Sequence, residues 1–238
     1  MRRVLVTRPE PGASRTAARL KALGFEPVVL PLTKIEPLRP SAPPAAGQSS
    51  AVAISSANAI RHAPADLLRK IAHLPAYAVG ERTGAAAREA GLTVADAGAG
   101  DAEKLVQRIA KGVEPGGRVL VLAGRVRRGT LEQGLSEAGF AVEIIETYDT
   151  LPLSPSPREI DAAFGSAPVD AVLFYSAAAA EMFGRLVEHT TAGLFEGAVF
   201  IAISARVAER LPEASRRRVS IAAEPTEEAM FSLIEAGM

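Results

Sequence analysis

Small polar and basic side chains recur where the predicted strands of this chain end and the next helices begin. Helix starts offer unpaired backbone N–H groups and a partial positive charge, which favour carboxylate or phosphate groups. Serine, threonine, glycine and arginine dominate these segments, whereas aspartate and histidine are scarce, so the pattern predicts an anionic ligand. The segments are Thr7-Arg8, Ser55-Ser56, Gly80 to Thr83, Gly98 to Asp101, Ala123 to Arg128, Tyr175-Ser176, Ser204 to Arg206 and Ala223 to Thr226.

Other familiar chemistries lack their signatures. There is no G-x-x-x-x-G-K-[ST] loop, and the second strand ends in Val29-Leu30-Pro31 without an acid for a ribose, so a nucleotide site is not expected. His62, His73 and His189 stand alone, without the spacing of metal ligands, and are expected to be surface or packing residues. The absence of cysteine excludes disulfides and thiolate chemistry. We therefore expect neither a nucleotide site nor a metal site.

The elements that carry these segments come from a βαβ unit that occurs twice. Residues 4–33 and 119–148 align without a gap, each as strand, turn, helix and strand. The βα units that follow recur as well: the segments starting at Ala51, Ala78 and Gly100 resemble those starting at Ala171, Ala202 and Pro225. Alternating strands and helices predict an α/β protein with two similar flavodoxin-like domains, each a mostly parallel sheet flanked by helices.

Proline-rich segments predict the domain boundaries, because boundaries fall in linkers of this composition. Prolines cluster after each copy of the βαβ unit rather than between the two repeats. We therefore expect residues 1–35 and 154–238 to form one discontinuous domain and residues 51–148 to form an inserted domain. Residues 36–50 and 149–153 are expected to be irregular linkers that form a hinge of two segments.

Composition narrows the class of partner. The 238 residues include 27 basic and 27 acidic side chains, so the net charge is zero and a general binder of nucleic acid or of membrane surfaces is not expected. No apolar run approaches the length of a membrane span. No coiled coil is evident, which makes a monomer the simpler expectation. The lack of cysteine is compatible with a reducing compartment, and we expect a cytoplasmic protein.

Motifs along most of the chain resemble those of the uroporphyrinogen-III synthase family. They are VLVTRP from Val4, ISSANA from Ile54, AVGERT from Ala78, GDAEKL from Gly100, VLAGRVRRGTL from Val121, ETYDT from Glu146 and AEPTEEA from Ala223. Each motif alone is short, and their order carries the resemblance. It implies a cofactor-free lyase that takes a linear tetrapyrrole with eight carboxylates, hydroxymethylbilane. Such enzymes expel its hydroxyl as water, invert ring D through a spiro intermediate and close the macrocycle in haem biosynthesis.

The resemblance also assigns roles to residues. The family's tyrosine at the end of the second βαβ unit falls on Tyr148, which would help the hydroxyl leave as general acid or hydrogen-bond donor, or would only pack at the hinge. The threonine of the VG-x-x-T motif falls on Thr83, which would bind a propionate or cap a helix. Val207 takes the place of the corresponding threonine in the second repeat, so a side-chain hydroxyl contact there is excluded.

The remaining expected substrate contacts come from equivalent strand ends. Arginines would pair with carboxylates or carry solvated loop charges. The serines have the same ambiguity between binding and capping as Thr83. The full set of expected substrate-binding residues is Thr7, Arg8, Ser55, Ser56, Thr83, Gly124, Arg125, Ser176, Ser204 and Arg206.

Two other classes of function stay open from the residues alone. Two α/β domains on a double linker would also suit a non-catalytic module that binds or senses an anionic ligand, because fold does not fix function. An enzyme that transfers a group from a nucleotide donor is disfavoured by the missing phosphate loop. The candidate acid Tyr148 favours catalysis over binding alone.

Overall fold

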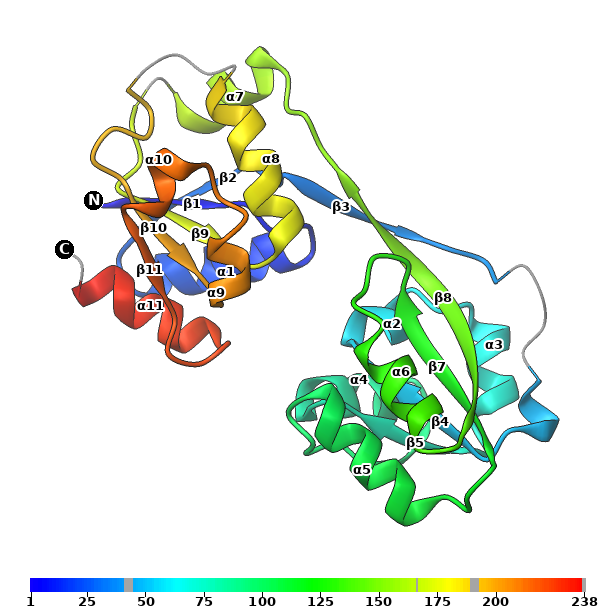
Figure 1. The fold of residues 1–238 in the computed structure, drawn as a ribbon. Helices are drawn as coiled ribbons and strands as arrows, with labels where there is room; N and C mark the ends of the chain where they lie inside the picture. The colour runs from blue at the N-terminus through cyan, green and yellow to red at the C-terminus, as the bar shows by residue number, and fades with distance from the viewer. Residues whose placement is uncertain (41–44, 166, 189–192, 237–238) are drawn as a thin grey trace. The chain divides into compact units, whose positions relative to one another are not determined.

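The computed structural model describes residues 1–40, 45–165, 167–188 and 193–236. These residues divide into two compact units, of which unit 1 comprises Met1–Ile35 with Leu151–Met238 and unit 2 comprises Glu36–Thr150. His189 and residues 41–44 of the predicted first linker lie outside the described residues. Figure 1 shows the course of the chain.

Unit 1 contains a parallel sheet with the strand order β11-β10-β9-β1-β2. Numbered along the chain within this unit, the strands follow the order 2-1-3-4-5, which is the flavodoxin-like order. Its elements are β1 (Arg3–Val6), α1 (Gly12–Ala22), β2 (Glu26–Val29), α7 (Pro157–Phe164), β9 (Ala171–Phe174), α8 (Ala177–Glu188), β10 (Val199–Ala202), α9 (Ala205–Ala208), α10 (Glu213–Arg216), β11 (Val219–Ile221) and α11 (Glu227–Ala236).

Unit 2 contains the sheet β3-β8-β7-β4-β5-β6. The pairs β8–β7, β7–β4, β4–β5 and β5–β6 are parallel. Its elements are η1 (Ala46–Gln48), β4 (Ala51–Ile54), α2 (Ala57–Arg61), α3 (Ala65–Ile71), β5 (Pro75–Ala78), α4 (Glu81–Glu89), β6 (Thr93–Asp96), α5 (Ala102–Gly112), β7 (Arg118–Gly124), α6 (Thr130–Glu137) and β8 (Ala141–Pro152), with β3 (Thr33–Pro37) at the sheet edge. Without β3, the order is again 2-1-3-4-5 if β7 is counted first, so unit 2 is a circular permutant of unit 1.

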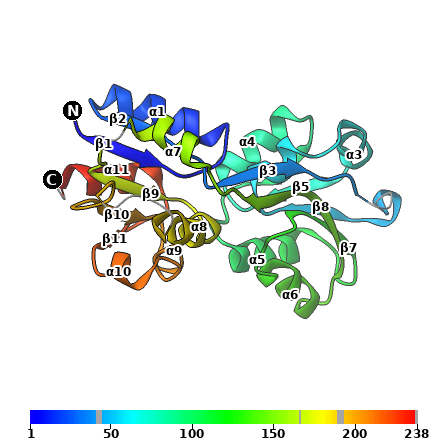
Figure 2. The ribbon, with the colours of Figure 1, turned by 90° about the horizontal axis from the view of Figure 1, so that it is seen from above.

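Helices cover both faces of each sheet because the strand residues are buried on both sides. In β1, Leu5 faces a cluster that includes Phe164 of α7, whereas Val4 and Val6 face the cluster of α1 and α11. In unit 2, Figure 2 shows α3 and α4 on one side of the strands and α5 and α6 on the other. The predicted fold class, two mostly parallel sheets flanked by helices, is confirmed.

The predicted irregular linkers differ from the structure at two places. The first begins inside β3, which ends at Pro37, and the second is occupied by β8, which continues to Pro152. Backbone hydrogen bonds join Leu38 to Thr147 and Leu153 to Leu32, so β3 and β8 run antiparallel. An edge strand tolerates proline because one side of its backbone has no strand partner. The number of prolines therefore wrongly predicted irregular structure at residues 36–37 and 149–152, which belong to strands.

Candidate functional site

A pocket of about 630 Å³ opens at the carboxyl ends of the parallel strands of unit 2. Its walls come from the end of β4, the end of β7, Tyr148 within β8, and the first turns of α5 and α6. It contains four of the predicted site residues, Ser55, Ser56, Gly124 and Tyr148. In open α/β sheets this edge is where ligands bind, because strand ends and helix starts meet there.

Tyr148 reaches this pocket through an irregularity in the pairing of β7 with β8. Ala123 pairs with Glu146, but Gly124 pairs with Tyr148, so Thr147 is an extra residue on β8. The hydroxyl of the buried Thr147 donates to the carbonyl of Ala59 in α2 at 2.8 Å. The bulge breaks the strand alternation, and the ring of Tyr148 packs against the same hydrophobic cluster that contains Ala59.

Gly124 leaves the space in which the ring of Tyr148 lies. A Cβ atom on Gly124 would be 2.6 Å from Cζ, 2.8 Å from Cε2 and 2.9 Å from the hydroxyl oxygen of Tyr148. The amide of Arg125 also donates to the Tyr148 carbonyl at 2.8 Å. The role of Gly124 in this structure is therefore to admit the tyrosine, since it has no side chain with which to contact a ligand.

His62 lies beside Tyr148 at the end of α2. The ring centroids are 6.1 Å apart and the ring planes are inclined by 44°. Burial, together with the nearby charge of Arg61, lowers the pKa of His62 below its ordinary value, so the imidazole is neutral at pH 7. No group of three or more metal-ligating side chains forms within the described part of the chain. His62 therefore acts on Tyr148 as a packing partner.

The serines and the threonine of unit 2 have structural partners. Ser56 is the N-cap of α2, where its hydroxyl accepts from the amide of Asn58 at 3.2 Å. The amide and hydroxyl of Ser55 both donate to the carbonyl of Leu122, at the long distance of 3.4 Å. The expectation that Thr83 caps a helix is wrong, because the N-cap of α4 is Gly80. Thr83 is buried, and its amide donates to the Gly80 carbonyl at 2.9 Å.

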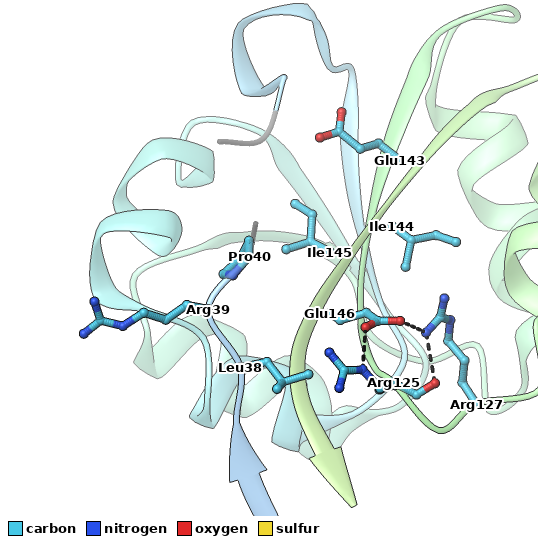
Figure 3. A pocket seen from close by; sticks show the side chains of 9 residues that line it. All are labelled: Leu38, Arg39, Pro40, Arg125, Arg127, Glu143, Ile144, Ile145 and Glu146. Atoms are coloured by element: carbon cyan, nitrogen blue, oxygen red, sulfur yellow. Dashed lines mark hydrogen bonds and ion pairs between the residues drawn. The ribbon is translucent and has the colours of Figure 1, made fainter. Parts of the chain in front are cut away.

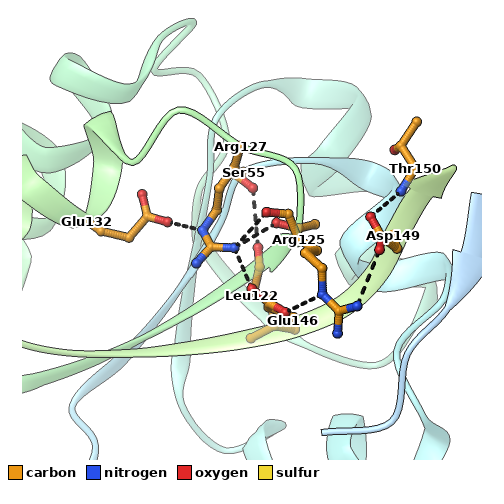
Figure 4. Close-up of polar contacts among 9 residues, drawn as sticks. Ser55, Leu122, Arg125, Arg127, Glu132, Glu146, Asp149 and Thr150 are labelled. Carbon is orange, nitrogen blue, oxygen red and sulfur yellow. Dashed lines mark hydrogen bonds and ion pairs between the residues drawn. The ribbon is translucent and has the colours of Figure 1, made fainter. Parts of the chain in front are cut away.

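Two arginines of the loop between β7 and α6 converge on one carboxylate, Glu146 of β8. Arg125 Nε lies 3.0 Å from Glu146 Oε2, and Arg127 Nη1 lies 2.8 Å from Glu146 Oε1. Arg125 also contacts the largely buried Asp149 at 3.3 Å, and Arg127 contacts Glu132 of α6. The hydrogen bonds from Arg127 and then Arg125 lower the pKa of Glu146, which stays ionised. Figures 3 and 4 show that Glu146 lies between the two guanidinium groups.

These ion pairs determine which positive side chains near the pocket lack a carboxylate partner and could pair with an anionic ligand. Arg127 is compensated by Glu132 and Glu146, and Arg125 by Glu146 and Asp149, so neither presents an uncompensated cation. Arg128 also lines the pocket, and the described residues provide it with no carboxylate within ion-pair distance. Arg128 is the better candidate for a ligand carboxylate than Arg125, which the sequence reasoning had preferred.

The start of α6 adds backbone donors to this pocket. Its N-cap, Gly129, has φ +76° and no capping side chain, and the first helical bond runs from the Gln133 amide to the Gly129 carbonyl. The amides of Thr130, Leu131 and Glu132 therefore precede the first intrahelical acceptor. A pocket with these amides and Arg128 is suited to a carboxylate even though its side chains carry acids as well as bases.

In unit 1, the predicted substrate-binding residues Thr7 and Arg8 contact other residues of the same unit. Thr7 is fully buried, and its hydroxyl donates to the Leu173 carbonyl at 2.7 Å. Arg8 lies over the ring of Tyr175, 4.3 Å from the centroid, and its Nη1 is 3.2 Å from Glu227 Oε1. Arg8 is therefore not a solvated loop charge. The side chain of Thr7 has a structural role, and Arg8 already has a carboxylate partner.

Glu227 collects the polar groups around Arg8. Its carboxylate accepts from the hydroxyls of Tyr175 and Thr16 and from the guanidinium of Arg19, with the Tyr175 bond at 2.7 Å. Burial alone would raise the pKa of Glu227, but these hydrogen bonds and the charge of Arg8 lower it below the ordinary value. Burial and the adjacent Glu227 raise the pKa of the Tyr175 hydroxyl, so this phenol stays protonated.

Three predicted residues of unit 1 lie where helices begin. The hydroxyl of Ser176 accepts from the Ala179 amide at 3.2 Å in the first turn of α8. Ser204 is the N-cap of α9 but makes no side-chain capping bond, and Arg206 is exposed on the same short helix. Val207 is buried, in agreement with its apolar side chain. Among the predicted site residues of unit 1, the side chains of Ser204 and Arg206 thus make the fewest contacts with other described residues.

Several acids with clear roles were missed by the sequence reasoning. Glu146 and Asp149 flank Tyr148 in the motif ETYDT, where a charged residue on each side of the tyrosine was the available signal. Glu227 was part of the motif AEPTEEA, but its partners Arg8 and Tyr175 are distant in sequence and gave no local sign of contact.

The fold and the pocket define a class: an α/β protein of two flavodoxin-like units with a pocket at the strand ends of unit 2. The family model for uroporphyrinogen-III synthase HemD matches residues 14–232. The chain belongs to the uroporphyrinogen-III synthase family. No curated protein sequence matches the chain.

Solved structures agree with the fold. The uroporphyrinogen-III synthetase of Helicobacter pylori is 19% identical with a TM-score of 0.72, and the match covers all of both chains. A mutant uroporphyrinogen III synthase of Thermus thermophilus is 20% identical with a TM-score of 0.57, covering 100% of this chain and 98% of that one. At these identities the likeness shows the two-domain α/β fold. No helix among the described residues is long and apolar enough to cross a membrane.

Proposed function

We propose that this chain is a uroporphyrinogen-III synthase that converts hydroxymethylbilane to uroporphyrinogen III without a cofactor. The observation that carries the proposal is the family match over residues 14–232. The pocket of unit 2 supports it, because a phenol, an uncompensated arginine and free helix amides lie around one space of about 630 Å³.

The first step requires that the carbon–oxygen bond of the hydroxymethyl group breaks. The electron-rich pyrrole next to this group supplies the electrons, and the hydroxyl leaves as water once it has received a proton. We assign the proton, or the hydrogen bond that assists departure, to the Tyr148 hydroxyl, since Tyr148 lines the pocket from within β8. The substituted carbon of ring D then attacks the electron-poor methylene that remains, which gives the spiro intermediate. The bond from this carbon to the bridge of the neighbouring ring breaks and forms again at the other side of ring D. Loss of a proton from ring D restores the pyrrole, so the macrocycle closes with ring D inverted and the net change is loss of one water.

Control of conformation is the larger part of this catalysis, because the leaving group departs readily and the unassisted cyclisation gives the isomer without inversion. Carboxylates of the substrate would be held by Arg128 and by the amides at the start of α6. In unit 1, we propose Ser204 and Arg206 as further contacts. We assign no direct substrate contact to Arg8, since Glu227 already pairs with it.

An assay of product isomers tests the proposal. Purified protein is supplied with freshly generated hydroxymethylbilane, and the products are oxidised and separated into porphyrin isomers I and III. Isomer III in excess, at a rate proportional to protein concentration, is expected. Isomer I alone, formed at the spontaneous rate in the presence of folded protein, would refute the activity. Binding of the tetrapyrrole under those conditions would point to a non-catalytic module.

Two properties complete the proposal. We expect a monomer, to be checked by light scattering coupled to size-exclusion chromatography, where a mass near 24.8 kDa is expected. We also expect a cytoplasmic location, which the absence of cysteine is compatible with, and cell fractionation would check it.

A further inference from the structure

The side chain of Arg127 is turned toward the protein between two outward-facing neighbours. Val126 and Arg128 are exposed, and Arg127 is exposed as a whole residue as well, but only 25% of its side chain is accessible because the guanidinium faces the protein. All three belong to the loop between β7 and α6, and all three line the pocket of about 630 Å³. Arg127 also lines a second pocket, of about 290 Å³, over β8 (Figure 3), so its side chain borders both pockets.

Four acceptors hold the guanidinium of Arg127. Its Nε contacts Glu132 in the first turn of α6, and its Nη1 contacts Glu146 of β8 at 2.8 Å. The same Nη1 donates to the carbonyls of Gly124 at 3.0 Å and Arg125 at 3.1 Å (Figure 4). One side chain therefore ties together the end of β7, the middle of β8 and the start of α6.

One of these contacts leads directly to Tyr148. The carbonyl oxygen of the peptide between Gly124 and Arg125 accepts from Arg127, and the N–H of that same peptide donates to the Tyr148 carbonyl at 2.8 Å. A peptide group is planar, so fixing its oxygen also fixes the direction of its N–H. Arg127 thereby constrains the backbone to which Tyr148 is bound, without touching the tyrosine ring.

Charge and geometry argue against direct substrate binding by Arg127. Its positive charge is compensated by Glu132 and Glu146. The contacts of its guanidinium use the single hydrogen of Nε and the two hydrogens of Nη1, so one hydrogen is shared between two acceptors. The planar guanidinium holds Nε and Nη1 apart in a fixed fork that faces Glu132 on one side and Glu146 on the other, whereas the ammonium of lysine is a compact point charge. The arrangement therefore depends on the shape of the arginine side chain.

We propose that Arg127 is a positioning residue for the proposed reaction, which fixes the β7–α6 loop so that Tyr148 and Arg128 keep their places in the pocket. The inference rests on the proposed function. It assigns to Arg127 a role in kcat and in the isomer ratio, and it assigns the binding of substrate carboxylate to other groups.

The test compares Arg127→Gln and Arg127→Lys with Arg118→Gln in the full-length protein. Arg118 is a matched control because it pairs with Glu143 across the same two strands at their other end, at 3.6 Å. Hydrogen exchange of residues 124–131, kcat, KM and the ratio of isomers III to I are measured, with enough enzyme to restore the total rate. Arg127→Gln is expected to speed exchange in the loop and to lower kcat by about tenfold, as misplacement of a reacting group does.

The other variants separate positioning from binding and from folding. KM is expected to change by less than about threefold in Arg127→Gln, and the share of isomer I should rise because conformational control is lost. Arg127→Lys keeps the charge but should recover only part of kcat, while Arg118→Gln should match the wild type in all four measurements. If Arg127→Gln does not fold, Glu132→Gln removes one anchor and the same changes are expected at smaller size.

Two results would overturn the role of Arg127 while the wild type is active. One is unchanged exchange of residues 124–131 in Arg127→Gln. The other is a large increase in KM with kcat preserved, which would make Arg127 a binding residue. An inactive wild type would instead refute the proposed function and, with it, any role in that reaction, although the exchange experiment would still report whether Arg127 orders the loop.

Discussion

Replacing Gly124 by alanine tests the position of the Tyr148 hydroxyl without altering the tyrosine. The new Cβ atom would be 2.6 Å from Cζ and 2.9 Å from the hydroxyl oxygen of Tyr148, whereas ordinary carbon contacts begin at 3.4 Å. The ring end must therefore move by about 0.8 Å. Gly124 does not have a positive φ, so alanine causes no backbone strain of its own.

A displacement of this size is large for a group that transfers or shares a proton. A shift of about 1 Å can cost on the order of 100-fold in rate, so Gly124→Ala is expected to lower kcat by roughly 10- to 100-fold. The extra methyl group should destabilise the protein by about 1–3 kcal/mol, which is the usual cost of overpacking. KM should change little, because the groups proposed to hold carboxylate lie in α6 and at Arg128.

The decisive assay is a double-mutant cycle with Tyr148→Phe, scored by initial rates of isomer III formation. If both changes act through the hydroxyl, the double variant should be no slower than Tyr148→Phe alone, because the group that alanine displaces is already absent. Losses that multiply in the double variant would refute the reasoning. A Gly124→Ala protein with full kcat would also refute it, provided that the variant is folded by circular dichroism.

Three further predictions concern single side chains. Tyr148→Phe should lower kcat by about 100-fold, the lower end for a general acid, with product affinity retained; equal losses in both would assign Tyr148 to packing or binding. Arg128→Gln should raise KM by about tenfold with kcat within about twofold, because it removes one charge-assisted carboxylate contact; an unchanged KM measured in steady-state kinetics would exclude that contact. Glu227→Gln should destabilise unit 1 by about 2 kcal/mol in urea unfolding at pH 7, because a partly buried acceptor of four donors loses its charge. Since the pKa of Glu227 is lowered in the folded state, this difference is present above the ordinary glutamate pKa and should shrink as pH falls through the folded-state value; a difference independent of pH down to pH 3 would contradict the charge-based explanation.

The fold class was predictable because its signals are local. A strand of consecutive apolar residues such as Val4 to Val6, a helix stripe and a closing glycine such as Gly24 lie within thirty residues of one another, and they repeat in the second copy. The family resemblance also rests on short local motifs. The strands β3 and the end of β8 were missed for the converse reason, since only their pairing with each other makes them strands.

The sequence predicted where in the fold the site lies, but it did not predict which side chains contact one another there. Three of the expected strand ends of unit 2 contribute to one pocket, through Ser55, Ser56, Asp101 and Gly124, because parallel strands bring their carboxyl ends to one edge. Thr83 and Arg125 do not line it. The partners of the arginines were not predictable: Glu227 is 219 residues from Arg8, and no local pattern connects them. The bulge at Thr147 and the contact of Gly124 with Tyr148 also depend on the register between β7 and β8. This register cannot be deduced from either strand alone.

The permuted order of strands has a consequence for how the chain is made. All strands of unit 2 from β4 to β8 are synthesised as one continuous stretch, so this unit can complete its parallel sheet while the ribosome is still translating. β1 is made first but lies between β2 and β9, and its residue Val4 pairs with Ala171. β1 therefore cannot pair with β9 until the whole of unit 2 has been synthesised. Unit 2 begins later in the chain than unit 1, yet it is the first unit that can finish folding.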